Sequence, residues 1–328
     1  MVQPSFCRTD LSHSTPGFCS RLTIMSLETH VPPAPISKGS AGVKHFFSVD
    51  VEEYFQVSAF ERTIPRADWS EWPQRLDQCL PPLLDALDRH GVKGTFFVLG
   101  WVAEHNPASV RRILNNGHEV ASHGYWHRRI PTMTPAEFRA DIRDSKHRLE
   151  DLAGTAVLGF RAPSFSITPG LEWTFDVLIE EGYLYDSSLF PVRRRGYGYP
   201  RAATTPHVIK RASGQLAEFP LATASIAGLS IPAAGGGYLR HFPLALIQLA
   251  FSQSDARRLP ATFYIHPWEI DSAQPRVPAS FLTRLRHYRG IDRGLARIEA
   301  LLKDFTFAPI ATGLDALMAV PSSGSTIG

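Results

Sequence analysis

Short apolar runs alternate with segments of helical periodicity along most of this chain. Apolar runs of strand length predict strands at 45–51, 94–99, 118–122, 156–160, 218–221 and 262–266. Apolar residues recurring every three to four positions predict helices at 74–90, 102–115, 134–152 and 168–181, and two helices within 281–303, broken near Gly290. Strands that alternate with helices indicate parallel βαβ units and therefore an α/β fold.

The predicted parallel sheet fits a barrel, complete or incomplete, better than a nucleotide-binding sheet. No glycine-rich phosphate-binding loop follows the first strand. Residues 190–240 break the alternation and are rich in Arg, Tyr, Gly and Pro, so we expect an insertion at the mouth of the site. In such barrels the catalytic residues gather at the carboxyl ends of the strands.

The two ends of the chain lack the periodicity of its middle. Residues 1–40 are rich in Ser, Thr and Pro, and we interpret them as a disordered leader or an overlong gene start. We expect one catalytic domain over 41–318 and a flexible tail over 319–328. No run approaches the roughly 18 apolar residues of a membrane span, and no secretory pattern is visible. We therefore expect a cytoplasmic protein without stable membrane insertion.

The overall charge is nearly balanced over the 328 residues. Lys and Arg total 34 against 31 Asp and Glu, a formal charge of +3 that does not indicate a nucleic-acid or membrane-surface binder. The three cysteines cannot form a disulfide framework. The least ordinary number is 13 histidines, so their positions relative to the strands become the main question.

Five polar clusters come directly after predicted strands, where one barrel rim would bring them together. They are Asp50 with Glu52 and Glu53, His123 with His127, Arg161 with Pro163 and Ser164, residues 185–188 with Asp186, and His266 with Pro267, Trp268 and Glu269.

The spacing of His123 and His127 places both imidazoles on one side of a helical turn, where they can hold one metal ion. Such a pair alone is more often ordinary polar packing, and a carboxylate from another strand end strengthens the metal interpretation. Strand alternation places Asp50 and Glu52 on one face and Glu53 on the other, so we prefer Glu52 as the partner of Asp50.

Arg161 and His266 each follow a buried strand. Arg161 is either a surface arginine or, in the stiff turn Arg-Ala-Pro-Ser, a guanidinium that orients a carboxylate. His266 by itself is more often a core histidine with satisfied hydrogen bonds. Beside a metal site it would be a general acid for a leaving amine.

Seven motifs follow one another along the chain: DVEEYFQV, TFFVLGWVAE, GHEVASHGYWH, GFRAPSFSI, YDSSLFP, GGGYLR and FYIHPWE. In this order they resemble the motifs of the polysaccharide deacetylases of carbohydrate esterase family four. The resemblance spans roughly 44–312 and is closest to a bacterial branch associated with exosortase-type exopolysaccharide gene clusters. It implies a distorted (β/α) barrel and a metal-dependent enzyme that removes acetyl groups from N-acetylated sugars. The implied partner is a carbohydrate, with no nucleic acid.

The resemblance also implies a role for each matching residue. Asp50 matches the general base, and His123 and His127 match the metal ligands of a divalent cation, for which we expect Zn²⁺. Arg161 matches the residue that orients the base, and Ser164 the position whose backbone N–H holds the oxyanion. His266 matches the general acid, and Asp186 the acidic residue that tunes it.

One departure from the family pattern concerns the metal site. The family places a metal-binding aspartate directly after the base, where this chain has Val51. Some relatives use acids separated by one residue, so we expect Glu52 to be the third ligand, with Glu53 as the alternative. Tyr125, Tyr238 and Trp268, with the segment 193–201, are expected to bind sugar, although ordinary loop packing explains them equally well.

Two other functions stay open. One is an amide hydrolase that acts on a cyclic amide or ureide with the same scaffold. The other is a non-catalytic carbohydrate-binding protein with a damaged metal site, which Val51 would favour.

Overall fold

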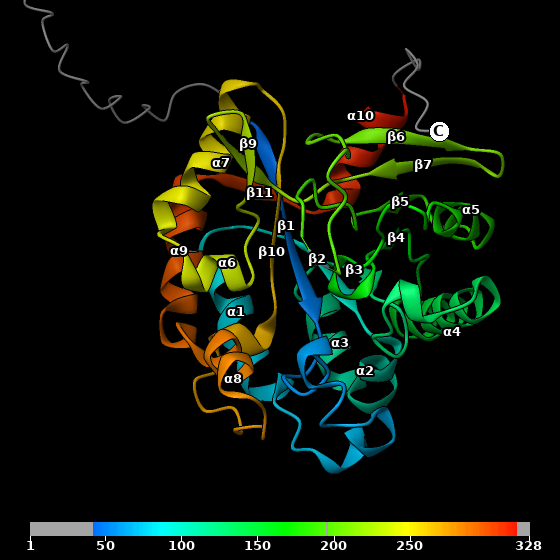
Figure 1. The fold of residues 1–328 in the computed structure, drawn as a ribbon, viewed down its shortest axis with the longest axis vertical. Coiled ribbons are helices and arrows are strands. Elements are labelled where there is room, and N and C mark those ends of the chain that lie inside the picture. The colour runs from blue at the N-terminus through cyan, green and yellow to red at the C-terminus, as the bar shows by residue number, and fades with distance from the viewer. Residues whose placement is uncertain (1–41, 195, 320–328) are drawn as a thin grey trace, which may run out of the picture. The chain divides into compact units, whose positions relative to one another are not determined.

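The computed structural model describes residues 42–194 and 196–319, which are coloured in Figure 1. The expected leader and nearly all of the expected tail lie outside these residues. The strands are β1 (Lys44–Val51), β2 (Thr95–Val98), β3 (Glu119–Ser122), β4 (Gly159–Phe160), β5 (Tyr185–Asp186), β6 (His207–Arg211), β7 (Gly214–Glu218), β8 (Thr223–Ile226), β9 (Leu229–Pro232), β10 (Thr262–Ile265) and β11 (Thr306–Ala308). The helices are α1 (Leu76–Arg89), α2 (Gly100–His105), α3 (Pro107–Asn115), α4 (Pro135–Ala153), α5 (Trp173–Glu180), α6 (Gly237–His241), α7 (Leu244–Ala256), α8 (Phe281–Tyr288), α9 (Gly294–Asp304) and α10 (Leu314–Met318).

Strand β1 lies inside a nine-stranded sheet of order β10-β1-β2-β3-β4-β5-β7-β6, with β11 also paired to β1. All pairings are parallel except the hairpin of β6 and β7. Seven of the eight β1 residues are buried, as expected for a strand covered on both faces. Since the strands are parallel, the carboxyl ends of β1, β2, β3 and β10 meet at one edge (Figure 1).

The sheet curls towards a barrel but is closed by irregular chain. After β7, the Leu221 N–H donates to the Leu189 carbonyl at 3.0 Å, and the Ala222 N–H donates to the Thr262 carbonyl at 3.1 Å. Leu221 also forms a single parallel bridge to Thr262, at the free edge of β10. The predicted α/β fold, a distorted and incompletely closed barrel, is confirmed.

Several element boundaries differ from the sequence prediction. The single helix expected over 102–115 is two helices, because Pro107 lacks an N–H and Asn106 caps α3, accepting the Ser109 N–H at 3.1 Å. The helix expected from 168 begins only at Trp173, after Gly170 with φ +94°. The strand expected at 218–221 overlaps β7 only at Glu218, because β7 spans Gly214–Glu218 and residues 219–221 lie beyond it.

The expected insertion at 190–240 contributes both to the sheet and to the rim. It supplies the β6–β7 hairpin, the separate β8–β9 hairpin and the short helix α6. Helix α7, which follows, was not identified from the sequence. None of the helices in the described ranges is long and apolar enough to cross a membrane.

Candidate active site

A cavity of about 360 Å³ opens at the carboxyl ends of β1 and β10. Its walls include Asp50, Glu52 and His127 from the predicted clusters, together with Ser164 and His266. These residues are far apart in the sequence, and the parallel register of the sheet brings them to one rim.

A possible metal-binding group lies at this cavity: Glu52 and His127 line it, and the His123 ring lies 5.3 Å from the His127 ring, between ring centroids. Glu52, His123 and His127 each offer a ligand atom, and these atoms lie within 4.8 Å of one another. The Glu52 Oε2 is 2.7 Å from the His127 Nε2. The His123 Nδ1 is 2.9 Å from the carbonyl oxygen of Arg161, so a proton on Nδ1 would leave Nε2 free as a ligand.

Burial and neighbouring charges set the protonation of this group. Burial alone would raise the pKa of Glu52, but His127 and His266 bring it well below its usual range. Burial and His127 hold the pKa of His123 well below its ordinary value. A charged carboxylate beside a neutral imidazole is the form in which these side chains bind a metal ion.

Glu53 has a different position. Its carboxylate accepts the Arg75 N–H at 2.9 and 2.8 Å and the Leu76 N–H at 3.1 Å. It therefore caps the amino terminus of α1, where free N–H groups favour an anion. Glu53 is not part of the metal-binding group, as the strand alternation had indicated.

Arg161 is fully buried and holds Asp50 in place. Its Nη1 donates to the Asp50 Oδ1 at 2.7 Å and to the Ser48 Oγ at 2.8 Å. The same guanidinium donates to the carbonyl and the hydroxyl of Ser187, and it lies 4.1 Å above the Phe97 ring. Four hydrogen bonds fix the position of the Arg161 guanidinium, and its bond to the Asp50 Oδ1 therefore fixes the orientation of the Asp50 carboxylate.

His266 lies between the carboxylates of Asp50 and Glu269. Its Nε2 is 3.9 Å from the Asp50 Oδ2, and its Nδ1 is 3.0 Å from the Glu269 Oε2. Arg240 donates to the other Glu269 oxygen at 2.6 Å. Burial opposes a charged imidazole, but Glu52 and Glu269 raise the pKa of His266 to about 9.

The structure corrects the partner expected for His266. The Asp186 carboxylate accepts the Ser188 hydroxyl at 2.5 Å and the Ser188 N–H at 3.1 Å. Burial raises the pKa of Asp186, and burial with the nearby Asp186 charge raises the pKa of Glu218. Glu269 thus takes the place that the sequence comparison gave to Asp186. In the sequence, Glu269 is the last residue of the motif HPWE, and Arg240 is the last residue of the motif GGGYLR. These two motifs are the sequence signals that could have identified the pair.

Two of the three single residues expected to bind sugar, Trp268 and Tyr238, line the cavity. Tyr197, from the segment 193–201, also lines it, and its hydroxyl is hydrogen-bonded to that of Tyr238. The Trp268 Nε1 donates to the Glu52 Oε1 at 3.1 Å, so this indole also fixes a possible metal ligand.

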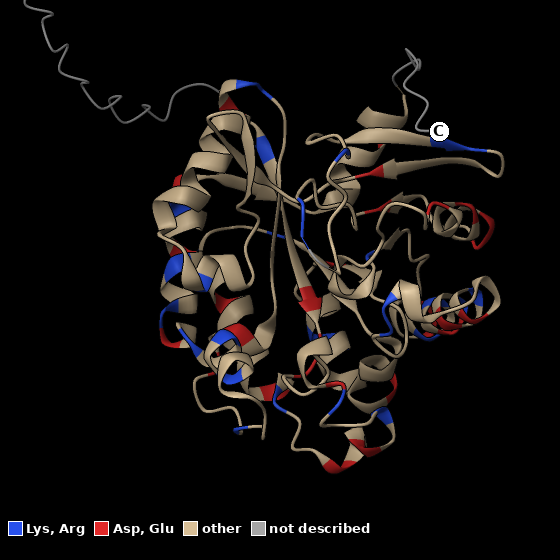
Figure 2. Ribbon diagram, in the orientation of Figure 1, with Lys and Arg blue, Asp and Glu red and all other residues tan. Residues whose placement is uncertain are grey.

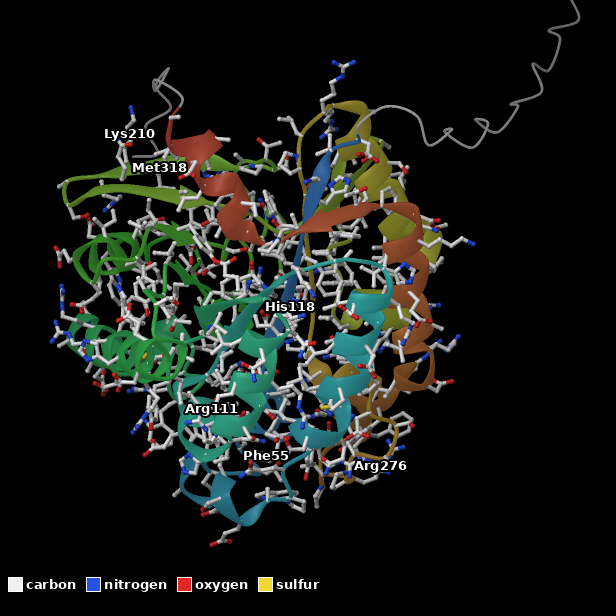
Figure 3. The ribbon with its side chains drawn as sticks, turned by 180° about the vertical axis from the view of Figure 1, so that it is seen from behind. Phe55, Arg111, His118, Lys210, Arg276 and Met318 are labelled. Atoms are coloured by element: carbon white, nitrogen blue, oxygen red, sulfur yellow. The ribbon has the colours of Figure 1, made fainter. Side chains whose placement is uncertain are left out.

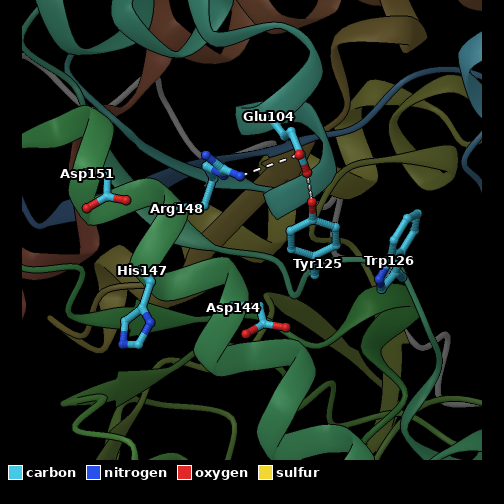
Figure 4. A pocket seen from close by; sticks show the side chains of 7 residues that line it. All are labelled: Glu104, Tyr125, Trp126, Asp144, His147, Arg148 and Asp151. Carbon is cyan, nitrogen blue, oxygen red and sulfur yellow. Dashed lines mark hydrogen bonds and ion pairs between the residues drawn. The ribbon is translucent and has the colours of Figure 1, made fainter.

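Tyr125 does not line this cavity, which corrects its assignment. It lies in a separate hollow of about 480 Å³ with Trp126 and residues of α4, where its hydroxyl bonds to Glu104 (Figure 4). His127, two residues further on, has a left-handed backbone conformation with φ +49° and lines the main cavity.

Ser164 lies in the cavity wall in a left-handed conformation, with φ +56°. Its hydroxyl is 2.8 Å from that of Ser58, which follows β1 and also lines the cavity. Sequence reasoning had not identified Ser58, because a lone serine in a loop carries no spacing signal.

Comparison with known proteins gives two family matches. Residues 71–173 match the family described as polysaccharide deacetylase, and residues 187–315 match a domain of unknown function, DUF3473. The first match supports the polysaccharide deacetylase family for the segment that carries both histidines of the metal-binding group. The second covers the segment with Arg240 and His266.

Curated relatives match over part of their length. A peptidoglycan-N-acetylglucosamine deacetylase of Bacillus cereus is 39% identical over 94 residues, which are 28% of this chain and 34% of the relative. A chitooligosaccharide deacetylase of a Bradyrhizobium species is 33% identical over 100 residues, 30% of this chain and 43% of the relative. The chain therefore spans less than half the length of each of these two relatives.

The fold of one solved structure is similar to that of this protein over 91% of the chain. A protein of Mycobacterium smegmatis assigned to the polysaccharide deacetylases superposes with a TM-score of 0.59 at 23% identity, covering 91% of this chain and 99% of the other. The fold is therefore an α/β fold of the polysaccharide deacetylase type.

Proposed function

We propose that this protein is a metal-dependent hydrolase that removes N-acetyl groups from amino sugars of a bacterial exopolysaccharide or of its lipid-linked precursor. One observation carries the proposal: the possible metal-binding group of Glu52, His123 and His127 adjoins a cavity that is also lined by two groups for proton transfer, Asp50 and His266. The similarity to deacetylases of N-acetylated glycans supports the reaction class. The assignment to the exosortase-associated branch rests on the motifs alone.

The donor set suits a divalent cation. Two imidazoles and one carboxylate are the ligands of many catalytic zinc sites, with positions left for water and substrate. The Glu52 Oε2 contacts the His127 Nε2 at 2.7 Å without the geometry of a hydrogen bond, and the buried His127 Nδ1 has no hydrogen-bond partner among the described residues. A cation held by Glu52, His123 and His127, for which we expect Zn²⁺, supplies Lewis-acid polarisation and makes water more acidic.

Asp50 is placed to accept the proton of the attacking water. Arg161 occupies its Oδ1, so Oδ2 is the oxygen that faces the cavity group His266. The fixed guanidinium also holds the carboxylate in one orientation, as positioning of a general base requires. In this role Arg161 is a positioning residue for Asp50.

His266 is placed to complete the reaction. After water has added to the acetamide carbonyl, the C–N bond breaks, and the amine leaves with a proton from the His266 Nε2 while acetate is released. Glu269 holds the His266 Nδ1 and thereby fixes which nitrogen faces the cavity. The backbone N–H of Ser164 would donate to the developing oxyanion, a contribution typically worth about 3 kcal/mol.

The aromatic wall supports a sugar as substrate. Tyr197, Tyr238 and Trp268 line the same cavity as the proton-transfer groups, and flat aromatic faces are suited to packing against sugar rings. Replacing Trp268 is expected to raise KM. The same change would also disturb Glu52, so Tyr238→Ala is the cleaner test of sugar contact.

The decisive experiment measures acetate release from N-acetylglucosamine oligomers by the purified protein, before and after chelation and after addition of Zn²⁺. We expect activity that chelation abolishes and Zn²⁺ restores. Activity that survives chelation, or a fully active His123→Ala variant, would contradict the proposal. Small ureides assayed in parallel distinguish the other amide hydrolase, and glycan binding without hydrolysis or bound metal would indicate a binding protein.

A further inference from the structure

Helix α8 presents a polar side chain to the interior and apolar side chains to the outside. His287 is 5% exposed, whereas Phe281 is 75%, Leu282 60% and Leu285 43% exposed. A surface helix of a soluble domain normally shows the opposite arrangement. Contiguous exposed apolar side chains of this size mark a surface that binds something.

The same segment is strongly basic. Residues 276–293 contain one acidic residue, Asp292, and five exposed arginines: Arg276, Arg284, Arg286, Arg289 and Arg293. In the part of the chain that the structure describes, only Arg293 of these five forms an ion pair, with Asp292 at 4.0 Å. Blue segments accordingly lie on and around α8 in Figure 2. The balanced charge of the whole chain conceals this local excess.

We propose that this α8 surface, formed by Phe281, Leu282 and Leu285 with the surrounding arginines, docks on an anionic phospholipid membrane. Apolar side chains of an interfacial helix enter the boundary between headgroups and acyl chains, while basic side chains pair with lipid phosphates. A membrane offers both components at once over a continuous layer. An acidic protein partner would satisfy the arginines but would also need an apolar recess for three long side chains.

Helix α8, whose outer side carries this surface, packs against the candidate active site through the buried His287 on its inner side. The His287 ring is 4.3 Å from the Trp268 ring and 4.7 Å from the Phe60 ring, between ring centroids. Trp268 in turn contacts Glu52, and Phe60 belongs to the short helix after β1. Arg276 and Phe55 lie at the same end of the molecule, opposite Lys210 and Met318 (Figure 3). Docking through α8 would therefore bring the cavity close to the membrane surface.

This placement suits a substrate carried by a lipid, a point that rests on the proposed function. The docking itself does not, because vesicle binding is measured without any turnover.

The test is co-sedimentation of the full chain with vesicles of phosphatidylcholine alone or mixed with phosphatidylglycerol. We expect binding to the mixed vesicles that weakens as salt increases. The variant Phe281→Ser/Leu282→Ser/Leu285→Ser should bind at least about tenfold more weakly, because buried apolar area contributes to interfacial affinity. Arg284→Gln/Arg286→Gln/Arg289→Gln should bind more weakly and lose most of the salt dependence.

Leu229→Ser is the matched control, since Leu229 is 65% exposed in the distant β8–β9 hairpin. It should bind vesicles like the wild type, and all variants should keep their melting temperature and their acetate release from soluble oligomers. Absence of binding to the mixed vesicles, or equal binding by the triple serine variant, would overturn the proposal. So would light scattering that shows a wild-type dimer and a monomeric triple variant with no vesicle binding by either, because the surface would then join two copies of the chain.

Discussion

Glu52 and Glu53 are neighbours in the sequence, yet they face different parts of the molecule. Glu52 contacts His127 and Trp268, whereas Glu53 receives three hydrogen bonds from the backbone at the start of α1. Successive residues of an extended chain point to opposite faces, and this rule persists for two residues beyond β1, which ends at Val51. The two carboxylates should therefore respond differently to the same substitution.

Replacing each glutamate by glutamine tests this difference. Glu52→Gln should weaken metal binding by about a hundredfold or more, because it removes the charged ligand of the proposed site. Glu53→Gln should leave metal content unchanged and lower the free energy of unfolding by about 1 kcal/mol, because the amide keeps only one acceptor oxygen for the Arg75 and Leu76 N–H groups. Metal analysis of dialysed protein and chemical denaturation measure the two effects. If Glu53→Gln lost the metal and Glu52→Gln kept it, the ligand assignment would be reversed.

Glu269 provides a second test among the individual residues. Glu269→Gln keeps the side chain's shape but removes the charge that holds the His266 Nδ1, so we expect kcat to fall by about ten- to a hundredfold. KM should change little, because Glu269 is fully buried and does not line the cavity. Steady-state kinetics on acetylated oligomers gives both constants, and metal content serves as the control. A purely structural role would lower the melting temperature while leaving kcat per folded molecule intact.

The sequence predicted most of the residues at this rim, and its errors have a physical reason. Asp50, His123, Arg161 and His266 were placed together because each lies at or just after the carboxyl end of a buried strand. Asp186 and Tyr125 lie at or after strand ends too, but the direction of a side chain depends on local backbone angles and on packing partners. Such contacts, including that of Glu269 with Arg240, arise only between segments that the fold brings together.

At the scale of elements, helix ends with strong capping signals were predicted well. The helix predicted from 134 begins with a capping box: the Thr134 hydroxyl accepts the Glu137 N–H at 3.3 Å, and the Glu137 carboxylate accepts the Thr134 N–H at 2.8 Å. The break at Asn106-Pro107 was missed because the apolar period continues across it. Periodicity reports which face is buried, and it does not report whether one helix or two provide that face.

Thr134→Ala should therefore destabilise α4 by about 1 kcal/mol, the usual cost of removing a side-chain cap. Thr132→Ala is the matched control, because this exposed hydroxyl donates only to the Arg129 carbonyl within a short turn. Urea denaturation of both variants measures the difference. Equal stability of the two would mean that tertiary packing alone fixes the start of α4.

At the scale of the whole molecule, closure of the sheet depends on contacts between distant segments, and no local sequence pattern predicts these contacts. Leu221 and Ala222 follow β7 without regular strand structure, yet they connect Leu189 to Thr262 and close the rim between distant segments. The alternation of strands and helices predicted the fold class because that pattern repeats many times. The irregular segment at Leu221 and Ala222 that closes the sheet occurs once, so no repeated sequence pattern could predict it.

Several of the histidines outside the site affect the stability of the whole fold. Burial lowers the pKa of His45 and of His118 to about 4, and that of His287 to about 3. Each is therefore neutral in the folded protein over a range where it is protonated in the unfolded chain. The unfolded state binds more protons there, so the free energy of unfolding falls as the pH falls.

His118 is the cleanest position at which to measure this effect. Its Nδ1 accepts the Gly94 N–H at 3.1 Å, and nearby Lys93 adds to the lowering of its pKa while Asp88 opposes it. Between an unfolded pKa near 6.5 and a folded value of about 4, His118 should cost about 2 kcal/mol of stability from pH 8 to pH 5. His118→Asn, which keeps an acceptor for Gly94 but does not titrate, should lower stability at pH 8 and show a smaller further loss at pH 5. In the same denaturation series, an unchanged slope for His118→Asn would show that its protonation is not coupled to folding.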